Sequence, residues 1–233
     1  MVAIRWLRTI IELVRGGNVD TLFAELHRRL YSDRYAFVLR RDLRTPFEAP
    51  AARIPLTVRP LQGNDVAELL QGDHPDDDPQ DKASRNRMVE AGLPGCHVGV
   101  TDGDRPCYMQ WLIGHRNNEQ IQRYFGDIFP ILKPDTALLE GAYTPAAHRG
   151  KGIMPAAMAQ IAERADRLGA RYVITFVGID NVASLKGCER AGFQPYAVRT
   201  ERFRFLRRRV TIEPLSDRHP YPLASSAGTA AAA

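Results

Sequence analysis

The sequence predicts a mixed α/β domain that follows an N-terminal helical extension, and three observations support this fold class. Strand-like and helix-like segments after residue 54 follow the order β-β-β-α-β-α-β-β. The length of 233 residues fits one large domain with an extension better than two full domains. Hydrophobic residues make up 44% and charged residues 25%, so the chain can bury a sizeable core, and global disorder is excluded.

Two helices are expected within residues 1–31. The first has an apolar and a basic face and ends at Gly16-Gly17, and the second carries leucines on its apolar side. We expect the first helix to pack on the main domain or on a partner subunit, as in a homodimer. Because Trp6 lies beside basic residues, association of residues 1–15 with a membrane surface is the alternative.

A strand is predicted at Tyr35–Arg40, and the chain then changes character. Prolines at positions 46, 50 and 55 punctuate a stretch that no helix could cross. We therefore expect three parts: a helical extension and linker (1–50), a main domain (54–215) and a disordered tail (216–233).

The main domain begins with a predicted strand at Leu56–Pro60, and Asn64 or Asp65 caps the helix that follows. Between Asn64 and Asp81 the chain has seven acids and no lysine or arginine, a local charge of −7. Prolines and glycines predict a loop at Gly72–Asp81. Since the run lacks the residue order of a calcium-binding loop, we interpret it as a solvated loop, with a divalent-cation site as the alternative.

The following segments predict a hairpin, a short helix and a central strand. The hairpin strands are expected at His97–Val100 and Tyr108–Ile113, on either side of an Asp-Gly turn. A short helix and a loop are expected within 119–132. Ala137–Thr144 follows as a central strand, which Pro145 ends.

The last part of the domain alternates between helices and strands. A helix is predicted at Ile153–Leu168, and the continuous apolar run Tyr172–Val177 is typical of a strand buried on both faces. A helix within 181–192 and two strands, Pro195–Phe205 and Val210–Glu213, complete the pattern.

Several classes of protein are disfavoured. Cys96, Cys107 and Cys188 lie far apart without a CxxC pair, which argues against a disulfide scaffold and a zinc site. No stretch reaches the ~20 apolar residues that span a bilayer, nor does any resemble a secretory leader, so we expect a cytoplasmic protein. Phenylalanines alternate with arginines within 199–209 as in a half-buried strand, so the net charge of +5 does not require a nucleic-acid partner.

The segment most suggestive of chemistry lies between the strand at 137–144 and the next helix. Gly150 and Gly152 let the backbone turn tightly, so that consecutive N–H groups converge at the positive end of that helix. Such an arrangement binds phosphate, and Arg149 and Lys151 add formal charge that suits a pyrophosphate. A Walker loop and a dinucleotide fingerprint both fail, because Pro145, Gly152 and Pro155 stand where their key residues would be. No G-x-S-x-G nucleophile elbow occurs.

The run Arg149-Gly150-Lys151-Gly152-Ile153-Met154 resembles the coenzyme A loop of the GNAT acetyltransferase superfamily, whose pattern is Arg/Gln-x-x-Gly-x-Gly/Ala. Residues 181–193 are similar to the family's helix that begins Asn-x-x-Ala/Ser and ends Gly-Phe, and the likeness covers roughly 54–215. It departs from the pattern at Met154, where the family prefers a small residue, and at Cys188, where many members carry a tyrosine.

The resemblance implies a largely antiparallel central sheet, flanked by helices, in which two central parallel strands splay apart to admit the pantetheine arm. It implies acetyl-CoA, or another acyl-CoA, as co-substrate and no metal. The residues it assigns to the co-substrate are Ala142, Tyr143, Thr144, Arg149, Gly150, Lys151, Gly152, Ile153, Met154, Asn181 and Ser184.

For catalysis, the resemblance points to Glu140 as the base and to Cys188 in the place of the acid. Strand alternation predicts that Glu140, Ala142 and Thr144 share one face. The alternatives are that Glu140 pairs with an arginine in the core and that Cys188 is a small buried side chain, with Tyr143 and Tyr196 as other proton carriers.

The expected reaction is N-acylation of a primary amine by direct attack on the thioester. In the family that this chain resembles, the region after the first strand forms a lip of the acceptor site, and here that region has a charge of −7. We therefore expect a cationic acceptor, such as a lysine side chain, polyamine or amino sugar. Two alternatives are a non-catalytic acyl-CoA-binding regulatory module and a transferase of the same fold that uses an acyl or aminoacyl carrier.

Overall fold

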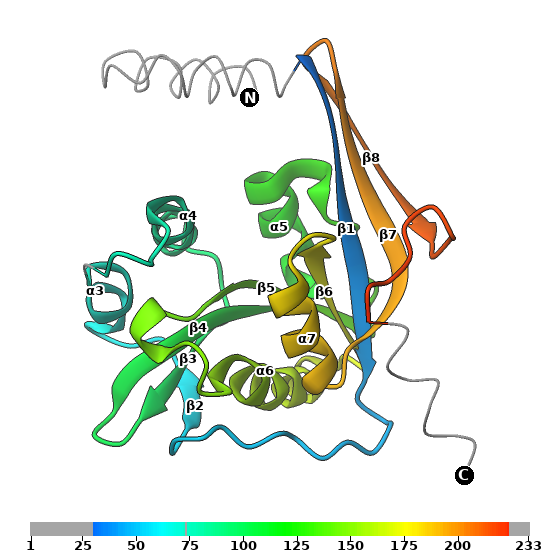
Figure 1. Cartoon of the computed structure of the whole chain (residues 1–233). Helices are drawn as coiled ribbons and strands as arrows, with labels where there is room; N and C mark the ends of the chain where they lie inside the picture. The colour runs from blue at the N-terminus through cyan, green and yellow to red at the C-terminus, as the bar shows by residue number, and fades with distance from the viewer. Residues whose placement is uncertain (1–29, 73, 224–233) are drawn as a thin grey trace, which may run out of the picture.

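One mixed sheet organises the chain. The computed structural model describes residues 30–72 and 74–223, and its eight strands lie in the order β2-β3-β4-β5-β6-β1-β7-β8 (Figure 1). All neighbouring strands are antiparallel except β5 and β6. The strands are β1 (Tyr31–Asp42), β2 (Thr57–Pro60), β3 (Cys96–Thr101), β4 (Arg105–Gly114), β5 (Thr136–Tyr143), β6 (Tyr172–Gly178), β7 (Gln194–Arg204) and β8 (Arg207–Pro214). The predicted mixed α/β class is confirmed for these residues.

Helices cover both faces of this sheet (Figure 1). They are α3 (Asp65–Leu70), α4 (Pro79–Glu90), α5 (Asn118–Phe125), α6 (Ile153–Glu163) and α7 (Val182–Arg190), with short 3-10 turns η1 (His115–Asn117), η2 (Gly126–Ile128), η3 (Ala146–His148) and η4 (Arg164–Leu168). One core contains Leu139 with residues of α6 and α7, and a second contains Leu138 with residues of α3, α4 and α5. Because neighbouring residues of β5 point into different cores, this strand is buried on both sides. Among the described helices, none combines the length and apolar character needed to cross a bilayer.

The two parallel strands separate soon after they begin. β5 and β6 pair only at Thr136–Tyr172, Ala137–Val173 and Leu138–Ile174, although both strands continue for several residues beyond. The splayed pair expected from the resemblance is therefore present. It leaves the carboxyl end of β5 without a strand neighbour on the β6 side.

β1 confirms the strand predicted at Tyr35–Arg40. The sequence analysis had assigned it to the extension and linker, 1–50, and this assignment is wrong. The strand pairs with β6 from Ala36 to Asp42 and with β7 from Tyr31 to Arg40, so it is an interior strand of the main sheet rather than part of an extension. Ala36–Leu39 are buried on both faces, which gives a continuous apolar run that does not reveal its partners. The two helices predicted within 1–31 lie almost entirely outside the described residues.

The predicted loop Gly72–Asp81 is wrong at its end, because α4 begins at Pro79. Asp78 is the N-cap residue, and its carboxylate accepts a hydrogen bond from the Gln80 amide at 2.8 Å. Aspartate at the N-cap followed by proline in the first turn is a strong helix start. The prediction counted Pro79 as a loop former and Asp78 only as one of seven acids, and so missed this signal.

Part of the predicted disordered tail also has a defined place. The ring of His219 lies 4.2 Å from that of Tyr35, and the ring of Tyr221 meets Phe37 edge-on at 4.9 Å. Aromatic contacts of this kind hold the chain against the sheet as far as Leu223, which packs on the core of the α6 side. The rest of the tail, 224–233, lies outside the described residues.

A bulge in β5 overturns the predicted alternation around Glu140. Trp111 pairs with Glu140 and Met109 with Tyr143, so three steps on β5 face two steps on β4. Gly141 absorbs the extra residue with a φ of +70°. Glu140 and Tyr143 therefore share a face of the sheet, while Ala142 packs with the core of the α6 side.

Replacing Gly141 by alanine tests how firmly the bulge is held. A Cβ at this position would lie 2.9 Å from Trp111 Cε3 and 3.0 Å from Met88 Cε, in addition to the cost of a positive φ. We expect Gly141→Ala to lower the free energy of unfolding by about 2–4 kcal/mol in urea titrations. Gly103→Ala is the matched control, because Gly103 has a φ of +75° with open space around it. Equal losses in the two variants would contradict tight packing at the bulge.

Candidate functional site

The loop from β5 to α6 takes the tight path that its glycines predict. After Pro145, the amides of His148 and Arg149 donate to the carbonyls of Pro145 and Ala146 at 2.8 and 3.1 Å, which forms the turn η3. Gly150 and Gly152 then have φ values of +75° and +73°. Both lie in the left-handed region, and Gly152 is the N-cap position of α6. The first amides of α6 consequently point out of the helix end without intrahelical partners.

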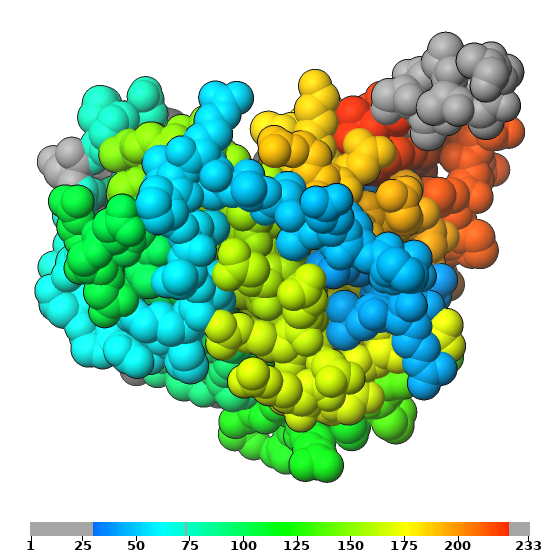
Figure 2. Space-filling view, turned by 90° about the horizontal axis from the view of Figure 1, so that it is seen from below, coloured from blue at the N-terminus to red at the C-terminus, as the bar shows by residue number. Residues whose placement is uncertain are grey.

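The linker between β1 and β2 supports this loop from outside. The amide of Arg53 donates to the Lys151 carbonyl at 2.8 Å, and a Cβ on Gly152 would lie 3.7 Å from the Ala51 carbonyl oxygen. Figure 2 shows the linker crossing the surface beside α6. The linker, predicted only as a connection, therefore packs against the glycine loop.

A groove of about 240 Å³ lies between this loop and α7. Its lining residues from the strand end, the loop and α6 are Thr144, His148, Arg149, Gly150, Gly152, Ile153, Met154 and Pro155, and those from α7 are Ala183, Lys186, Gly187 and Arg190. Six residues assigned by the resemblance are among them. The others, Ala142, Tyr143, Lys151, Asn181 and Ser184, do not line the groove.

The cations of α7 were missed by the sequence analysis. Lys186 and Arg190 are four residues apart, so both face the groove from one side of the helix. This spacing was the available signal. By contrast, the Lys151 ammonium turns back to the Ala147 carbonyl at 2.9 Å.

Asn181 has a structural part in the same helix. Its side-chain oxygen accepts a hydrogen bond from the Ser184 amide at 3.0 Å and so caps α7. The cap fixes where α7 begins, and hence where Lys186 and Arg190 stand.

Arg149 is held in place rather than free. Its guanidinium donates to the Thr144 carbonyl at 3.1 Å and to the Asp76 carbonyl at 2.9 Å, and lies 3.3 Å from the Asp77 carboxylate. Asp77 also accepts from the Ala146 amide at 2.8 Å and pairs with Lys82 at 3.1 Å. Burial would raise the pKa of Asp77, but the Ala146 amide and Lys82 outweigh it, and the pKa lies below its usual value.

The acidic segment, Asn64–Asp81, is partly neutralised within the domain. Asp65 forms an ion pair with Arg59 at 2.6 Å, and Asp81 one with Arg85 at 2.8 Å. With Asp77 facing Arg149 and Asp78 capping α4, only part of the predicted charge of −7 is available to an acceptor. The argument for a cationic acceptor is correspondingly weaker.

Met154 packs against α7. Its sulfur occupies the space over Gly187, where an added Cβ would overlap it. The side chain therefore extends to the far wall of the groove and leaves the Met154 amide in the first turn of α6. A residue larger than the family's preferred glycine or alanine is accommodated because Gly187 faces it.

Glu140 stands at the last regular position of β5 before the bulge. Burial raises its pKa, although the Gly141 amide and the charges of Arg85 and Arg199 act in the opposite direction. Arg85 is engaged with the Ala142 carbonyl at 3.0 Å, and Arg199 lies over the Phe176 and Phe129 rings. Among the described residues, no ion pair to Glu140 is formed, so the core-pairing alternative finds no support.

The three candidate proton donors, one cysteine and two tyrosines, differ in placement. The Cys188 thiol is 1% exposed, lies 3.9 Å from Met158 Sδ, and has its pKa raised to about 12 by burial. These surroundings favour the interpretation as a small buried side chain. Tyr143 lies on the Glu140 face, and burial raises its pKa to about 12 as well. Tyr196 is 38% exposed on β7, and burial raises its pKa too.

A metal site is not apparent in the parts of the chain that the structure describes, where no group of three His, Cys, Asp or Glu side chains is placed to hold an ion. The described residues of the acidic segment therefore give no support to the alternative of a divalent-cation site.

Comparisons with known proteins bear on the loop and the fold. The family model described as acetyltransferase (GNAT) family matches residues 64–193, more than half of the chain. A search of curated proteins finds no match.

Several solved structures are similar to this chain at low sequence identity. A glucosamine N-acetyltransferase region of a fungal multi-domain GH3 β-N-acetylglucosaminidase is 14% identical with a TM-score of 0.54, over 78% of this chain and 22% of that one. A GCN5-related N-acetyltransferase from Sphaerobacter thermophilus is 16% identical with a TM-score of 0.46, over 79% and 57%. A GNAT-family acetyltransferase from Colwellia psychrerythraea is 13% identical with a TM-score of 0.47, over 84% and 62%. The chain thus spans less than two thirds of each of these structures.

Asp77→Asn tests the electrostatic support of the loop. Because the pKa of Asp77 is lowered, its carboxylate stabilises the fold above its unfolded pKa of 3.8 and loses this effect as the pH falls through the lower folded value. We expect the variant to lose about 2 kcal/mol of unfolding free energy at pH 7, and the difference from the native chain to vanish in acid. Asp76→Asn, at an 80% exposed side chain, is the control and should change little. A loss that persists unchanged in acid would contradict the charge argument.

Proposed function

This chain belongs to the GNAT acetyltransferase family, and we propose that it transfers an acetyl group from acetyl-CoA to a primary amine. The proposal is supported above all by the loop between β5 and α6, where two left-handed glycines turn backbone amides toward a groove lined by Arg149, Lys186 and Arg190. Backbone donors, a helix N-terminus and fixed cations are the groups that hold a diphosphate.

The splay of β5 and β6 supplies the second requirement. Since the two strands pair at only three positions, the edge of β5 beyond Leu138 is available to an extended chain such as the pantetheine arm. The groove and this edge meet at Thr144, which directly follows β5 and lines the groove. A ligand with a diphosphate and an extended arm therefore matches the order of these features along the chain.

Acetyl-CoA supplies an activated thioester, whose acyl carbon bonds to the amine nitrogen as the carbon–sulfur bond breaks. The amine must lose a proton, and we assign Glu140 to receive it, directly or through water. Burial raises the pKa of Glu140, which makes its carboxylate a stronger base than an exposed one. The acceptor would then approach on the face of β5 shared by Glu140 and Tyr143.

The acceptor is assigned here only as a primary amine. Three acids of the segment predicted to attract a cation, Asp65, Asp77 and Asp81, have basic partners of their own. Comparing a polyamine, an amino sugar and a neutral amine in the same assay would establish whether positive charge in the acceptor matters.

The burial of Cys188 keeps a second candidate function open, that of an acyl-CoA-binding regulatory module without turnover. A thiol with a pKa of about 12 inside the core is poorly placed to protonate a leaving thiolate. Such a module would bind acetyl-CoA but release no thiol with any amine. A transferase that uses a carrier-bound acyl group would instead leave free coenzyme A unbound.

The groove predicts which variants lose the co-substrate. Lys186→Ala and Arg190→Ala should each raise the Kd for acetyl-CoA about tenfold in calorimetric titration, because each removes one charge-assisted contact to phosphate. Lys133→Ala and Arg167→Ala, which lie outside the groove, should leave the Kd unchanged. If the native chain binds no acetyl-CoA, or if all four variants bind equally, the assignment of the groove fails.

Glu140→Gln separates a base from a structural carboxylate. Because the carboxylate is the active form and its pKa is raised, kcat/KM of the native enzyme should fall as the pH drops through a value above the usual carboxyl range. The variant should lose about 10²–10³-fold in kcat and this acid limb of the pH profile, with the Kd for acetyl-CoA retained. A variant that is merely less stable, with the native pH profile, would remove Glu140 from the mechanism.

A further inference from the structure

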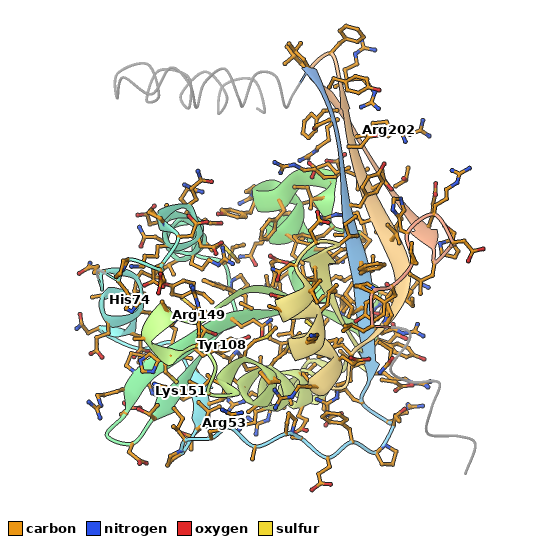
Figure 3. All side chains as sticks on the ribbon, in the orientation of Figure 1. Arg53, His74, Tyr108, Arg149, Lys151 and Arg202 are labelled. Carbon is orange, nitrogen blue, oxygen red and sulfur yellow. The ribbon has the colours of Figure 1, made fainter. Side chains whose placement is uncertain are left out.

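A three-stranded ribbon extends beyond the main sheet. β1 pairs with β6 only from Ala36 onward, whereas Tyr31–Tyr35 pair with β7 alone, and β7 pairs in turn with β8. Figure 1 shows β1, β7 and β8 continuing past the body of the domain, and Figure 3 places Arg202 on them well away from Arg149. The end of this ribbon is therefore a separate surface from the groove.

The turn at the end of the ribbon displays large apolar side chains. Phe205 and Leu206 form a two-residue turn, with φ values of +48° and +66°, and are 83% and 51% exposed. Turns of this geometry favour asparagine and glycine, so phenylalanine and leucine are costly choices here. Leu30 and Tyr31 lie beside them, since the Phe205 amide donates to the Leu30 carbonyl at 2.9 Å and Tyr31 pairs with Arg204. Four of the ten exposed large hydrophobic side chains among the described residues thus gather at this end of the ribbon.

Arginines surround this apolar tip. A groove of about 670 Å³ beside it is lined by Arg202, Arg204, Phe205, Arg207, Arg208 and Arg209. Arg202 pairs directly with Arg209 across the ribbon, and Arg204 with Arg207, so four arginines share one face. Like charges in directly opposite positions of a sheet destabilise it.

Few acids compensate for these arginines. Asp33, which lies opposite Arg202 on β1, forms ion pairs with Arg202 and Arg204 at 3.4 and 2.7 Å. Arg208 points to the other side, where it meets Asp127 and Glu201. Arg207 and Arg209 form no ion pair with any acid of the described residues and are exposed. The face thus keeps an excess of positive charge that an anionic partner would relieve.

We propose that the tip of the ribbon docks on an anionic lipid surface, with Phe205, Leu206 and Tyr31 in the interface and the arginines at the level of the lipid phosphates. Strand residues rise about 3.3 Å each, so Arg202–Arg204 and Arg207–Arg209 stand roughly 3–10 Å behind the tip, which is the depth of the headgroup region. Leucine and phenylalanine at a projecting turn suit insertion between lipids, and a leucine has no groups that read a nucleic-acid base.

The sequence before the tip has matching chemistry. The chain enters the described region at Leu30, next to Phe205, so residues 1–29 are joined to this end of the ribbon. Their sequence includes the basic segment with Trp6 for which membrane-surface association was an alternative.

Vesicle flotation of the full chain tests the proposal. The native protein should float with vesicles of phosphatidylcholine mixed with phosphatidylglycerol, remain unbound with phosphatidylcholine alone, and dissociate as salt is raised. Arg207→Gln with Arg209→Gln should weaken partitioning about fivefold for each arginine. The control is Arg116→Gln with Arg167→Gln, which removes equal charge from exposed positions elsewhere and should partition as the native chain does.

A second variant addresses the apolar tip without endangering the fold. Phe205→Asn with Leu206→Gly introduces the residues that the turn geometry favours, so thermal stability should be retained or raised while vesicle binding is lost. Failure of the native chain to bind anionic vesicles would overturn the proposal. Unchanged binding in both tip variants, or tighter binding to a single-stranded RNA than to these vesicles, would do so equally.

Discussion

The early separation of β5 from β6 is the constraint on which the rest of the site depends. After Leu138 and Ile174 the two strands no longer pair, and a strand that leaves its neighbour must find other partners for its buried backbone groups. The bulge at Gly141 turns β5 while keeping it attached to β4, and Arg85 from α4 satisfies the Ala142 carbonyl at 3.0 Å. Glu140 lies where β5 leaves β6, and the glycine loop follows the end of β5. The separation of the two strands therefore positions both.

The sequence was most informative where backbone conformation depends on residue type. Gly150 and Gly152 were expected to turn the loop, and both have positive φ. The regular alternation assumed around Glu140 failed, because a single glycine inside an apolar strand does not reveal whether it carries a bulge. Distant contacts were equally hidden: nothing near Asp77 in the sequence indicates Arg149 as its partner, and the apolar run of β1 is compatible with any interior position of the sheet.

The two arginine-rich regions of the chain differ in how their charge is compensated. At the loop, Arg149 is fixed by two backbone carbonyls and by Asp77, whose own charge is shared with Lys82. These contacts fix the position of the Arg149 guanidinium against the loop, and the Asp77 carboxylate reduces the net charge there. At the ribbon, arginines face arginines, and Asp33 serves two of them. The first pattern suits a small ligand bound in a fixed geometry, and the second suits a diffuse anionic surface that tolerates variable contacts.

β1 connects these two regions. At its carboxyl end the chain passes into the linker whose Arg53 amide holds the Lys151 carbonyl, and at its amino end it forms one edge of the ribbon beneath the Phe205 turn. Between these ends, Ala36–Leu39 are buried between β6 and β7, so the strand cannot shift along its axis without exposing apolar side chains and breaking pairing on both sides. A rigid strand of this kind fixes the orientation of the glycine loop relative to the tip. Docking at the tip would therefore set the direction in which the groove and the Glu140 face are presented to an acceptor.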